Sequence, residues 1–245
     1  MKSSFLAFVV ASLGVLARPG ARRGRPSSHY TNLPYTARKS AAARQQGDSP
    51  WGGAVQEGQG WTMVTGTATV PSVSGQDPNA SAAIWVGIDG YSCQTAILQT
   101  GFDVWGDGRI ETWYEWYPEQ SYDYDVDIGA RPGHQIRMTV YADGANGGNS
   151  TLENLSTGQS ATQTFQGQSE SLCLADAEWI VEDFLSGGGS VPFVDFGQVQ
   201  FTDAQASGSQ GTVTPEGSII VEVTVNGQQH TQCSADASGV QCQYV

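Results

Sequence analysis

The sequence predicts an all-β protein, an antiparallel β-sandwich, on the strength of three observations. Apolar and polar residues alternate with a period of two in several short segments. Turn residues separate these segments, and glycine alone accounts for 31 residues. Helix signals are sparse. Many short strands joined by turns are typical of a sandwich or a barrel, and about 200 residues is an ordinary size for one such domain.

Three segments show the alternation most clearly. Residues 64–70 and 136–141 place apolar side chains on one face and mostly polar side chains on the other. Residues 220–225 alternate in the same way, and the Asn226-Gly227 pair that follows is a strong signal for a hairpin turn. We therefore expect half-buried strands in all three places.

Two further kinds of segment complete the expected pattern. Residues 193–201 form another strand candidate, which is interrupted at Gly197. Residues 143–150 and 186–190 are rich in glycine and small polar residues, and we expect them to be loops.

The amino-terminal residues are expected to lie outside the folded domain. Residues 1–17 combine Lys2, an apolar run over 5–16 and a small residue, Ala17, before a cleavage point. This is the pattern of a secretory signal peptide. The apolar run is too short to cross a bilayer, and no later segment is apolar enough. We expect a secreted, extracellular product without a membrane span.

A basic segment, residues 18–47, precedes a strongly acidic body, residues 48–245. The first has a net charge of +7 with no acidic residue, and the second has a net charge of −21. A disordered tail or a nucleic-acid-binding arm is the alternative interpretation. A removable pro-segment fits better, because it follows a signal peptide. We expect it to bind the acidic domain as an inhibitor and to loosen as carboxylates become protonated.

The acidic body favours an acidic medium. Its carboxylates repel one another at neutral pH, and below about pH 4 most exposed ones are protonated. The same charge argues against nucleic acid as a partner, since nucleic-acid binding requires a basic surface. We expect a monomeric domain of residues 48–245.

The even number of cysteines in an exported chain predicts disulfides, with three pairings open. The cysteines are Cys93, Cys173, Cys233 and Cys242. Metal binding is not expected, because no CxxC spacing occurs and the acidic body holds only His134 and His230. Three Asn-X-Ser/Thr sequons are candidate glycosylation sites: Asn79, Asn149 and Asn154.

Residues 111–118, Glu-Thr-Trp-Tyr-Glu-Trp-Tyr-Pro, combine carboxylates with aromatic rings. In an extended strand Glu111, Trp113 and Glu115 point to one face. Such a face is not ordinary dry core, because unpaired buried charge is costly. We interpret it as the wall of a cleft that binds a polymer. A solvent-exposed face is the alternative.

Residues 177–184, Ala-Glu-Trp-Ile-Val-Glu-Asp-Phe, fit two structures. As a strand they place Glu178 and Glu182 on one face. As a helix they place the same two residues one turn apart, so spacing alone leaves the choice open. Earlier in the chain, Asp89 between glycines indicates a turn. By residue chemistry alone, Gln99 reads as an ordinary polar strand residue.

Several mechanisms lack their motifs. The sequence contains no GxSxG, no HExxH, no P-loop and no Asp-Thr-Gly or Asp-Ser-Gly triplet. What remains is carboxylate chemistry assisted by amide or hydroxyl groups.

Seven segments, taken together and in order, are similar to the eqolisin family of glutamic peptidases. They are residues 51–54, 83–90, 93–103, 113–118, 151–155, 177–184 and 240–245. The resemblance implies a concanavalin-like jelly roll of two seven-stranded antiparallel sheets with a cleft on the concave sheet. It also implies the bridges Cys93–Cys173 and Cys233–Cys242.

The resemblance further implies an acid endopeptidase, without cofactor or metal, whose catalytic pair is Gln99 and Glu182 rather than Glu178. Glu182 would activate a water that attacks the peptide bond directly, and Gln99 would stabilise the oxyanion. The resemblance places four more residues in or near the cleft, as substrate contacts: Trp51, Asp89, Trp113 and Glu115.

Two departures from the family pattern stand out. Pro50 replaces the usual Asn before the tryptophan, which is expected to alter the rim of the cleft. The positions of a third bridge found in some members are occupied by Phe184 and Val191, so we expect a looser loop over residues 185–190.

Two other functions fit the residue chemistry. A secreted glycoside hydrolase on a similar sandwich would use paired glutamates, Glu115 and Glu182, in an aromatic cleft. A non-catalytic lectin would use the aromatic face to bind sugar.

Overall fold

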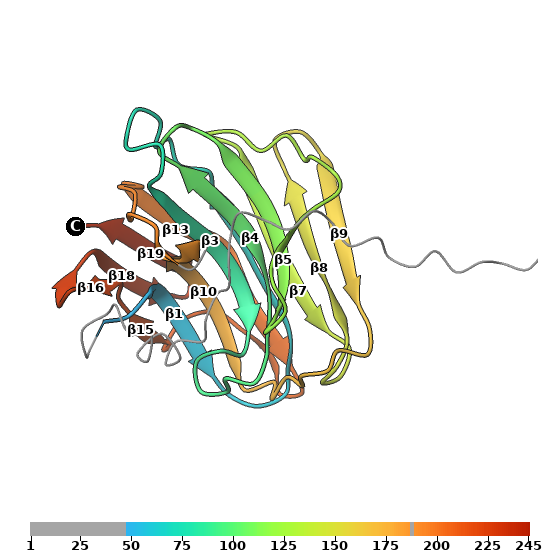
Figure 1. The fold of residues 1–245 in the computed structure, drawn as a ribbon. Coiled ribbons are helices and arrows are strands. Elements are labelled where there is room, and N and C mark those ends of the chain that lie inside the picture. The colour runs from blue at the N-terminus through green and yellow to red at the C-terminus, as the bar shows by residue number, and fades with distance from the viewer. Residues whose placement is uncertain (1–47, 187–188) are drawn as a thin grey trace, which may run out of the picture.

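The computed structural model describes residues 48–186 and 189–245. The expected signal peptide, residues 1–17, and the expected pro-segment, residues 18–47, lie outside the described residues. The all-β prediction is confirmed, since every regular element in the described part is a strand (Figure 1). In that part no helix is present that is long and apolar enough to cross a membrane.

Two antiparallel sheets form a sandwich (Figure 1). The first sheet has seven strands in the order β15-β1-β10-β3-β4-β5-β6. Its strands are β1 (Trp51–Glu57), β3 (Ser81–Ile88), β4 (Ile97–Trp105), β5 (Ile110–Tyr117), β6 (Tyr122–Asp123), β10 (Asp176–Glu182) and β15 (Ile219–Val221).

The second sheet follows the order β18-β19-β13-β2-β7-β8-β9, and β14 also pairs with β13. It therefore has eight strands instead of the expected seven, because the short β14 folds back along the end of β13. Its strands are β2 (Trp61–Thr69), β7 (Gln135–Ala142), β8 (Gly148–Asn154), β9 (Gln159–Phe165), β13 (Gln198–Gly208), β14 (Gly211–Val213), β18 (Thr231–Asp236) and β19 (Gly239–Tyr244). Two small hairpins complete the fold: β11 (Leu185–Ser186) with β12 (Gly189–Ser190), and β16 (Thr224–Val225) with β17 (Gln228–Gln229).

Apolar residues cover both faces of the first sheet. Between the sheets, Trp179 and Ile84 pack with residues of the second sheet such as Phe201. On the other face of the first sheet lies a second apolar cluster, which includes Trp85 and Ile180. A strand buried on both faces needs a nearly continuous apolar run, and this is why 177–184 lacks the alternation of 136–141.

Four segment boundaries differ from the expectation. The strand expected over residues 193–201 begins only at Gln198, because Gly197 has a positive φ of 67° that ends extended backbone. The strand expected over residues 220–225 is divided between β15 and β16. Both expected loops also contain strand residues, at the start of β8 and in the β11–β12 hairpin.

The side chain of Asn154, the acceptor of one candidate sequon, is buried in the fold. It is 0% exposed, and its amide nitrogen donates to the carbonyls of Ile128 and Gly129 and bonds the ring nitrogen Nδ1 of His134. By contrast, Asn79 is exposed in a turn. A glycan on Asn154 would leave buried acceptors without their donor and would displace packed atoms.

We therefore expect glycopeptide mass spectrometry of protein made in a eukaryotic secretory host to find Asn154 unmodified. Asn79 is the accessible acceptor and serves as the internal comparison. A glycan on Asn154 in the folded, active fraction would contradict this prediction.

Candidate active site

A row of side chains crosses the first sheet on the face turned away from the second sheet. Strand pairing places Glu178 of β10 opposite Gly87 of β3, Gly87 opposite Gln99 of β4, and Gln99 opposite Glu115 of β5. The helical alternative for residues 177–184 is wrong, because β10 pairs along its length with β1 and β3. Residues two apart in a strand share a face, so Glu182 lies on this same face.

Gln99 is held by a carboxylate from the neighbouring strand. Its Nε2 donates to Oε2 of Glu115 over 2.9 Å, and both side chains are buried. A carboxamide has two N–H donors on one nitrogen. Because Glu115 accepts from one of them, the plane of the amide and the direction of the other N–H are fixed.

Glu182 is held in turn by an indole. Nε1 of Trp85, on β3, donates to Oε2 of Glu182 over 2.9 Å. Gln99 and Glu182 thus lie on one face of one sheet, with β3 between their strands. The row between theirs contains Ile180, Trp85 and Gly101, and Trp85 is the member that reaches both sides.

Two glycines make room for Trp85. A Cβ at Gly87 would lie 2.9 Å from Cζ3 of Trp85 and 3.3 Å from Cβ of Gln99. Trp85 and Gln99 therefore pack side by side above Gly87. A Cβ at Gly101 would lie 2.5 Å from Cβ of Trp85 and 2.3 Å from the carbonyl oxygen of Ile84. Neither position accepts a larger residue without displacing the indole.

Indole–carboxylate pairs recur across this face. Nε1 of Trp113 donates to Asp103 over 2.8 Å, and Nε1 of Trp105 donates to Glu111 over 3.1 Å. Together with the pair of Trp85 and Glu182, three carboxylates are each fixed by an uncharged donor. Trp113 is expected from the sequence as a substrate contact, but its pairing with Asp103 is not, and neither Asp103 nor Trp85 is among the expected site residues. The alternation of carboxylate and tryptophan within β4 and β5 is the signal that could have revealed it.

Trp51 belongs to the same face. Strand pairing places it opposite Glu182, and its ring meets that of Trp85 edge to face with centroids 5.0 Å apart. The departure from the family pattern at Pro50 leaves this contact in place, and the Pro50 carbonyl accepts the backbone N–H of Asp183 over 2.9 Å. The first strand of the domain is thereby fastened to the end of β10.

Asp89 lies at the end of β3 and holds the segment that leads into β10. It follows β3 with a positive φ of 69°, and its two oxygens accept the backbone N–H groups of Cys173, Leu174, Ala175 and Asp176. Burial raises the pKa of Asp89, and these backbone hydrogen bonds oppose the rise. Its carboxylate is aimed at the backbone before β10, so these contacts support that segment, and the substrate contact that the resemblance implies for Asp89 stays a prediction.

The implied disulfide pairing is confirmed. Cys93 is bonded to Cys173, and Cys233 is bonded to Cys242. The first bridge joins the loop after β3 to the segment before β10, which is the segment that Asp89 binds. Two independent connections therefore fix the start of the strand that carries Glu178 and Glu182.

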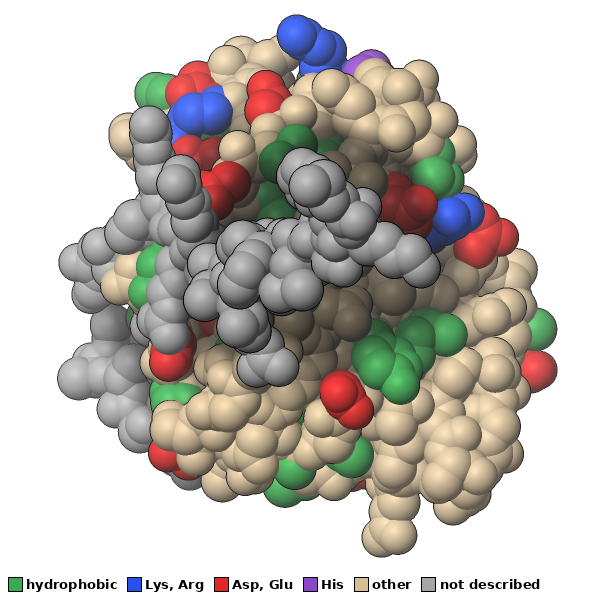
Figure 2. All heavy atoms as spheres, turned by 90° about the vertical axis from the view of Figure 1, so that its right-hand side faces the viewer, with side chains coloured by type: hydrophobic (Ala, Val, Ile, Leu, Met, Phe, Trp, Pro, Cys, Tyr) green, Lys and Arg blue, Asp and Glu red, His purple; other side chains and the backbone are tan. Residues whose placement is uncertain are grey.

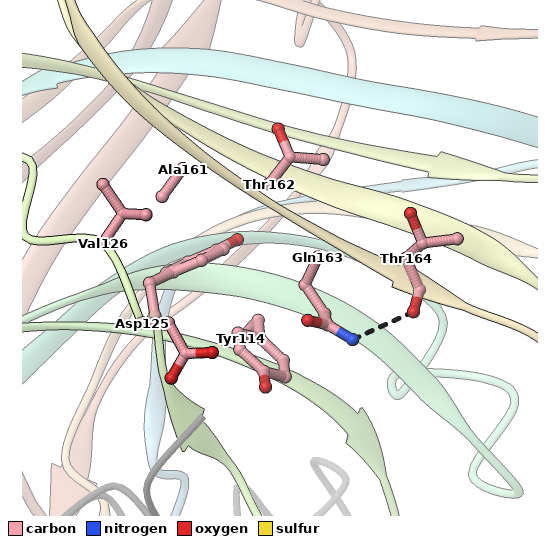
Figure 3. A pocket seen from close by; sticks show the side chains of 8 residues that line it. Tyr114, Asp125, Val126, Ala161, Thr162, Gln163 and Thr164 are labelled. Atoms are coloured by element: carbon pink, nitrogen blue, oxygen red, sulfur yellow. Dashed lines mark hydrogen bonds between the residues drawn. The ribbon is translucent and has the colours of Figure 1, made fainter. Parts of the chain in front are cut away.

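A separate cavity of about 280 Å³ lies at the far edge of the sandwich, near β5 and β9 (Figure 3). Tyr114, Gln163 and a single carboxylate, Asp125, are among its lining residues. It lacks a second acidic group, so it does not provide paired acid and base. Acidic side chains are also scattered over the surface in Figure 2. Within the described residues, no group of three or more His, Cys, Asp or Glu is placed to hold a metal ion.

Comparison with known proteins identifies the family of the chain. A sequence profile of the peptidase A4 family matches residues 49–244. The chain is 40% identical over 259 residues to aspergillopepsin-2 of Aspergillus niger, and the alignment covers 94% of this chain and 91% of that protein. It is 41% identical over 251 residues to scytalidopepsin B of Scytalidium lignicola, and that alignment covers 99% of this chain and 95% of that protein.

Among solved structures, the fold is similar to that of scytalido-glutamic peptidase with a transition state analog inhibitor. The TM-score is 0.76 at 44% identity, over 80% of this chain and 98% of that chain. The family profile and both relatives cover nearly the whole acidic domain. This chain therefore belongs to the peptidase A4 family, the eqolisin glutamic peptidases.

Proposed function

We propose that the protein is an acid endopeptidase in which Glu182 and Gln99 carry the reaction on polypeptide substrates. Glu182, as a carboxylate, takes a proton from water and later returns it to the leaving nitrogen. Gln99 donates an amide N–H to the oxygen that becomes negative in the tetrahedral intermediate. The water attacks directly, so the proposal involves no acyl-enzyme.

The observation that carries the proposal is the hydrogen-bonded group on one face of the first sheet. Trp85 connects the two residues, since it donates to Glu182 and packs beside Gln99 above Gly87. Glu115 fixes the direction of the Gln99 amide. A base and an oxyanion donor held on rigid strands are preorganised for a single reacting bond.

The neutral donors suit an acidic working pH. An indole or a carboxamide keeps its hydrogen-bonding pattern at every pH in the working range, so Glu182 is the member of the pair that changes charge. This differs from a pair of carboxylates, which must share one proton. Activity is therefore expected where part of the Glu182 population is ionised and where the acidic domain is not strongly self-repelling.

The glycosidase alternative assigns acid and base to Glu115 and Glu182. Glu115, however, accepts the hydrogen bond from Gln99, which favours a supporting role for it. The glycosidase reading also leaves Gln99 secondary, so a substitution at Gln99 separates the two functions.

Gln99→Ala is expected to lower kcat for cleavage of a denatured protein at acid pH by a factor of roughly 10² to 10³, because an oxyanion donor is lost. The assay uses denatured protein and xylan side by side, and Gln205→Ala, an exposed glutamine on β13, serves as the matched control. Near-normal proteolysis by Gln99→Ala would overturn the assignment. Xylan hydrolysis by the parent protein would favour the glycosidase, and a parent protein inactive on both substrates would favour the lectin.

The proposal extends to the maturation and the location of the protein. We infer a secreted, monomeric enzyme of residues 48–245, released from a basic pro-segment of residues 18–47 that inhibits it. The opposite net charges of the two parts, +7 and −21, support this attraction at neutral pH and its weakening in acid. Binding of a synthetic 18–47 peptide to the mature domain should weaken between neutral and acid pH, and an unchanged affinity would contradict the inference.

A further inference from the structure

Glu178 is the exception among the carboxyl groups on the site face. Glu182, Asp103 and Glu111 each accept from an indole, and Glu115 accepts from Gln99. Glu178 is 0% exposed, and neither of its oxygens has a hydrogen-bond partner within the described structure. A buried polar group left without partners is costly and calls for an explanation.

The position of Glu178 points to the catalytic group. It lies directly across Gly87 from Gln99, and Gly87 has no side chain to separate them. The space above Gly87 is occupied by the edge of the Trp85 ring and by Cβ of Gln99. Glu178 thus lies in the same row as Gln99, one member of the proposed pair, and next to the row of Trp85, which donates to the other member, Glu182.

Among the described residues, the charged groups nearest to Glu178 on its own strand, on the adjacent strands and in its row are acidic. They are Asp176 and Glu182 on β10, Asp89 after β3, Glu115 on β5 and Glu57 on β1. The arginines of the described part lie elsewhere: Arg109 is bound to Asp107 and Glu111, Arg137 to Glu153 on the second sheet, and Arg131 precedes β7. Burial, and then the charges of Asp176 and Asp89, raise the pKa of Glu178 well above its ordinary value.

We propose that Glu178 is a positioning residue for the proteolytic site, which permits catalysis as an uncharged acid and turns the site off when it ionises. As an uncharged acid it leaves the donor of Trp85 to Glu182 and the donor of Gln99 to Glu115. As a carboxylate it would need a donor, and the amide of Gln99, directly across Gly87, is the donor of the catalytic group in the same row. It would also repel Glu182 and Glu115. The inference rests on the proposed function and adds to it the cause of the activity loss above the acid range.

The test is the pH profile of kcat/KM for Glu178→Gln and Glu178→Leu, measured on active enzyme produced from the full-length chain. Both replacements remain neutral at every pH. We expect the alkaline limb to move upward by about one pH unit or more, which corresponds to a roughly tenfold gain over the parent at a fixed pH on that limb. The acid limb, set by Glu182, should stay where it is. Glu216→Gln, at an exposed glutamate, is the matched control and should leave both limbs unchanged.

Near-ultraviolet circular dichroism at each pH separates positioning from simple stability. The folded-state pKa of Glu178 lies above that of the unfolded chain, so its contribution to stability is present in acid and is lost as the pH rises through the folded-state pKa. The proposal requires the parent to lose activity while still folded. It is overturned if the alkaline limb of both variants coincides with that of the parent, or if the parent's limb follows its own unfolding. Retained activity in Glu182→Gln would instead refute the proposed function itself.

Discussion

Replacing Glu182 by glutamine should lower kcat at the acid optimum by a factor of roughly 10² to 10⁴, the range that general acid–base catalysis contributes. Glutamine has nearly the same shape, and its carbonyl oxygen accepts the hydrogen bond that Trp85 donates over 2.9 Å. What it lacks is the capacity to take a proton from water and return it to the leaving nitrogen. KM should change little, because the shape of the site is retained.

The measurement is steady-state kinetics on a peptide substrate, with a thermal melt to show that the variant is folded. Glu216→Gln makes the same chemical change at an exposed glutamate and should keep full activity. A Glu182→Gln enzyme with more than about a tenth of the parental kcat would remove Glu182 from the role of base. A loss of activity accompanied by a collapse of the melt would show that Glu182 acts through stability instead.

How far the sequence leads depends on whether a feature is local. The alternation in 64–70 and 136–141 predicts β2 and β7 correctly, because each of these strands buries one face and leaves the other less buried. Residues 177–184 could not be assigned from spacing, since Glu178 and Glu182 suit either a strand or a helix. Pairing with β1 and β3, which lie far away in the chain, decides the matter.

The same limit applies to the site. Residue chemistry makes Gln99 an ordinary strand residue, and only the resemblance to a family singles it out. Its partner Glu115 lies 16 residues away in the sequence. Trp85 and Glu182, which are hydrogen-bonded to each other, are 97 residues apart. The hydrogen-bond partners of Asp89 could not be predicted for the same reason, because they begin 84 residues downstream. Sequence patterns place side chains on faces, and tertiary pairing decides which of them meet.

Asp89→Asn is expected to cause the largest loss of stability among single isosteric changes near the site. The carboxylate accepts four backbone N–H groups, those of residues 173–176, with distances of 2.7 to 3.2 Å. In asparagine one of the two oxygens becomes an NH₂ group, which would face N–H donors. At about 1–3 kcal/mol for each unsatisfied buried group, and with part of the segment open to water, the expected loss is about 3 kcal/mol. For a domain of this size that is a fall in Tm of roughly 6–12 °C.

Asp107→Asn provides the matched control, because Asp107 also accepts a backbone N–H, from Arg109, but lies exposed in a turn. Its Tm should change by at most about two degrees. Differential scanning calorimetry of both variants near neutral pH measures the difference, because the raised pKa of Asp89 favours its protonated form in acid. Equal Tm values for the two would mean that the segment before β10 is held by the Cys93–Cys173 bridge alone. A large gap between them would establish that a buried carboxylate, placed by one residue of positive φ at the end of β3, anchors the strand that carries Glu182.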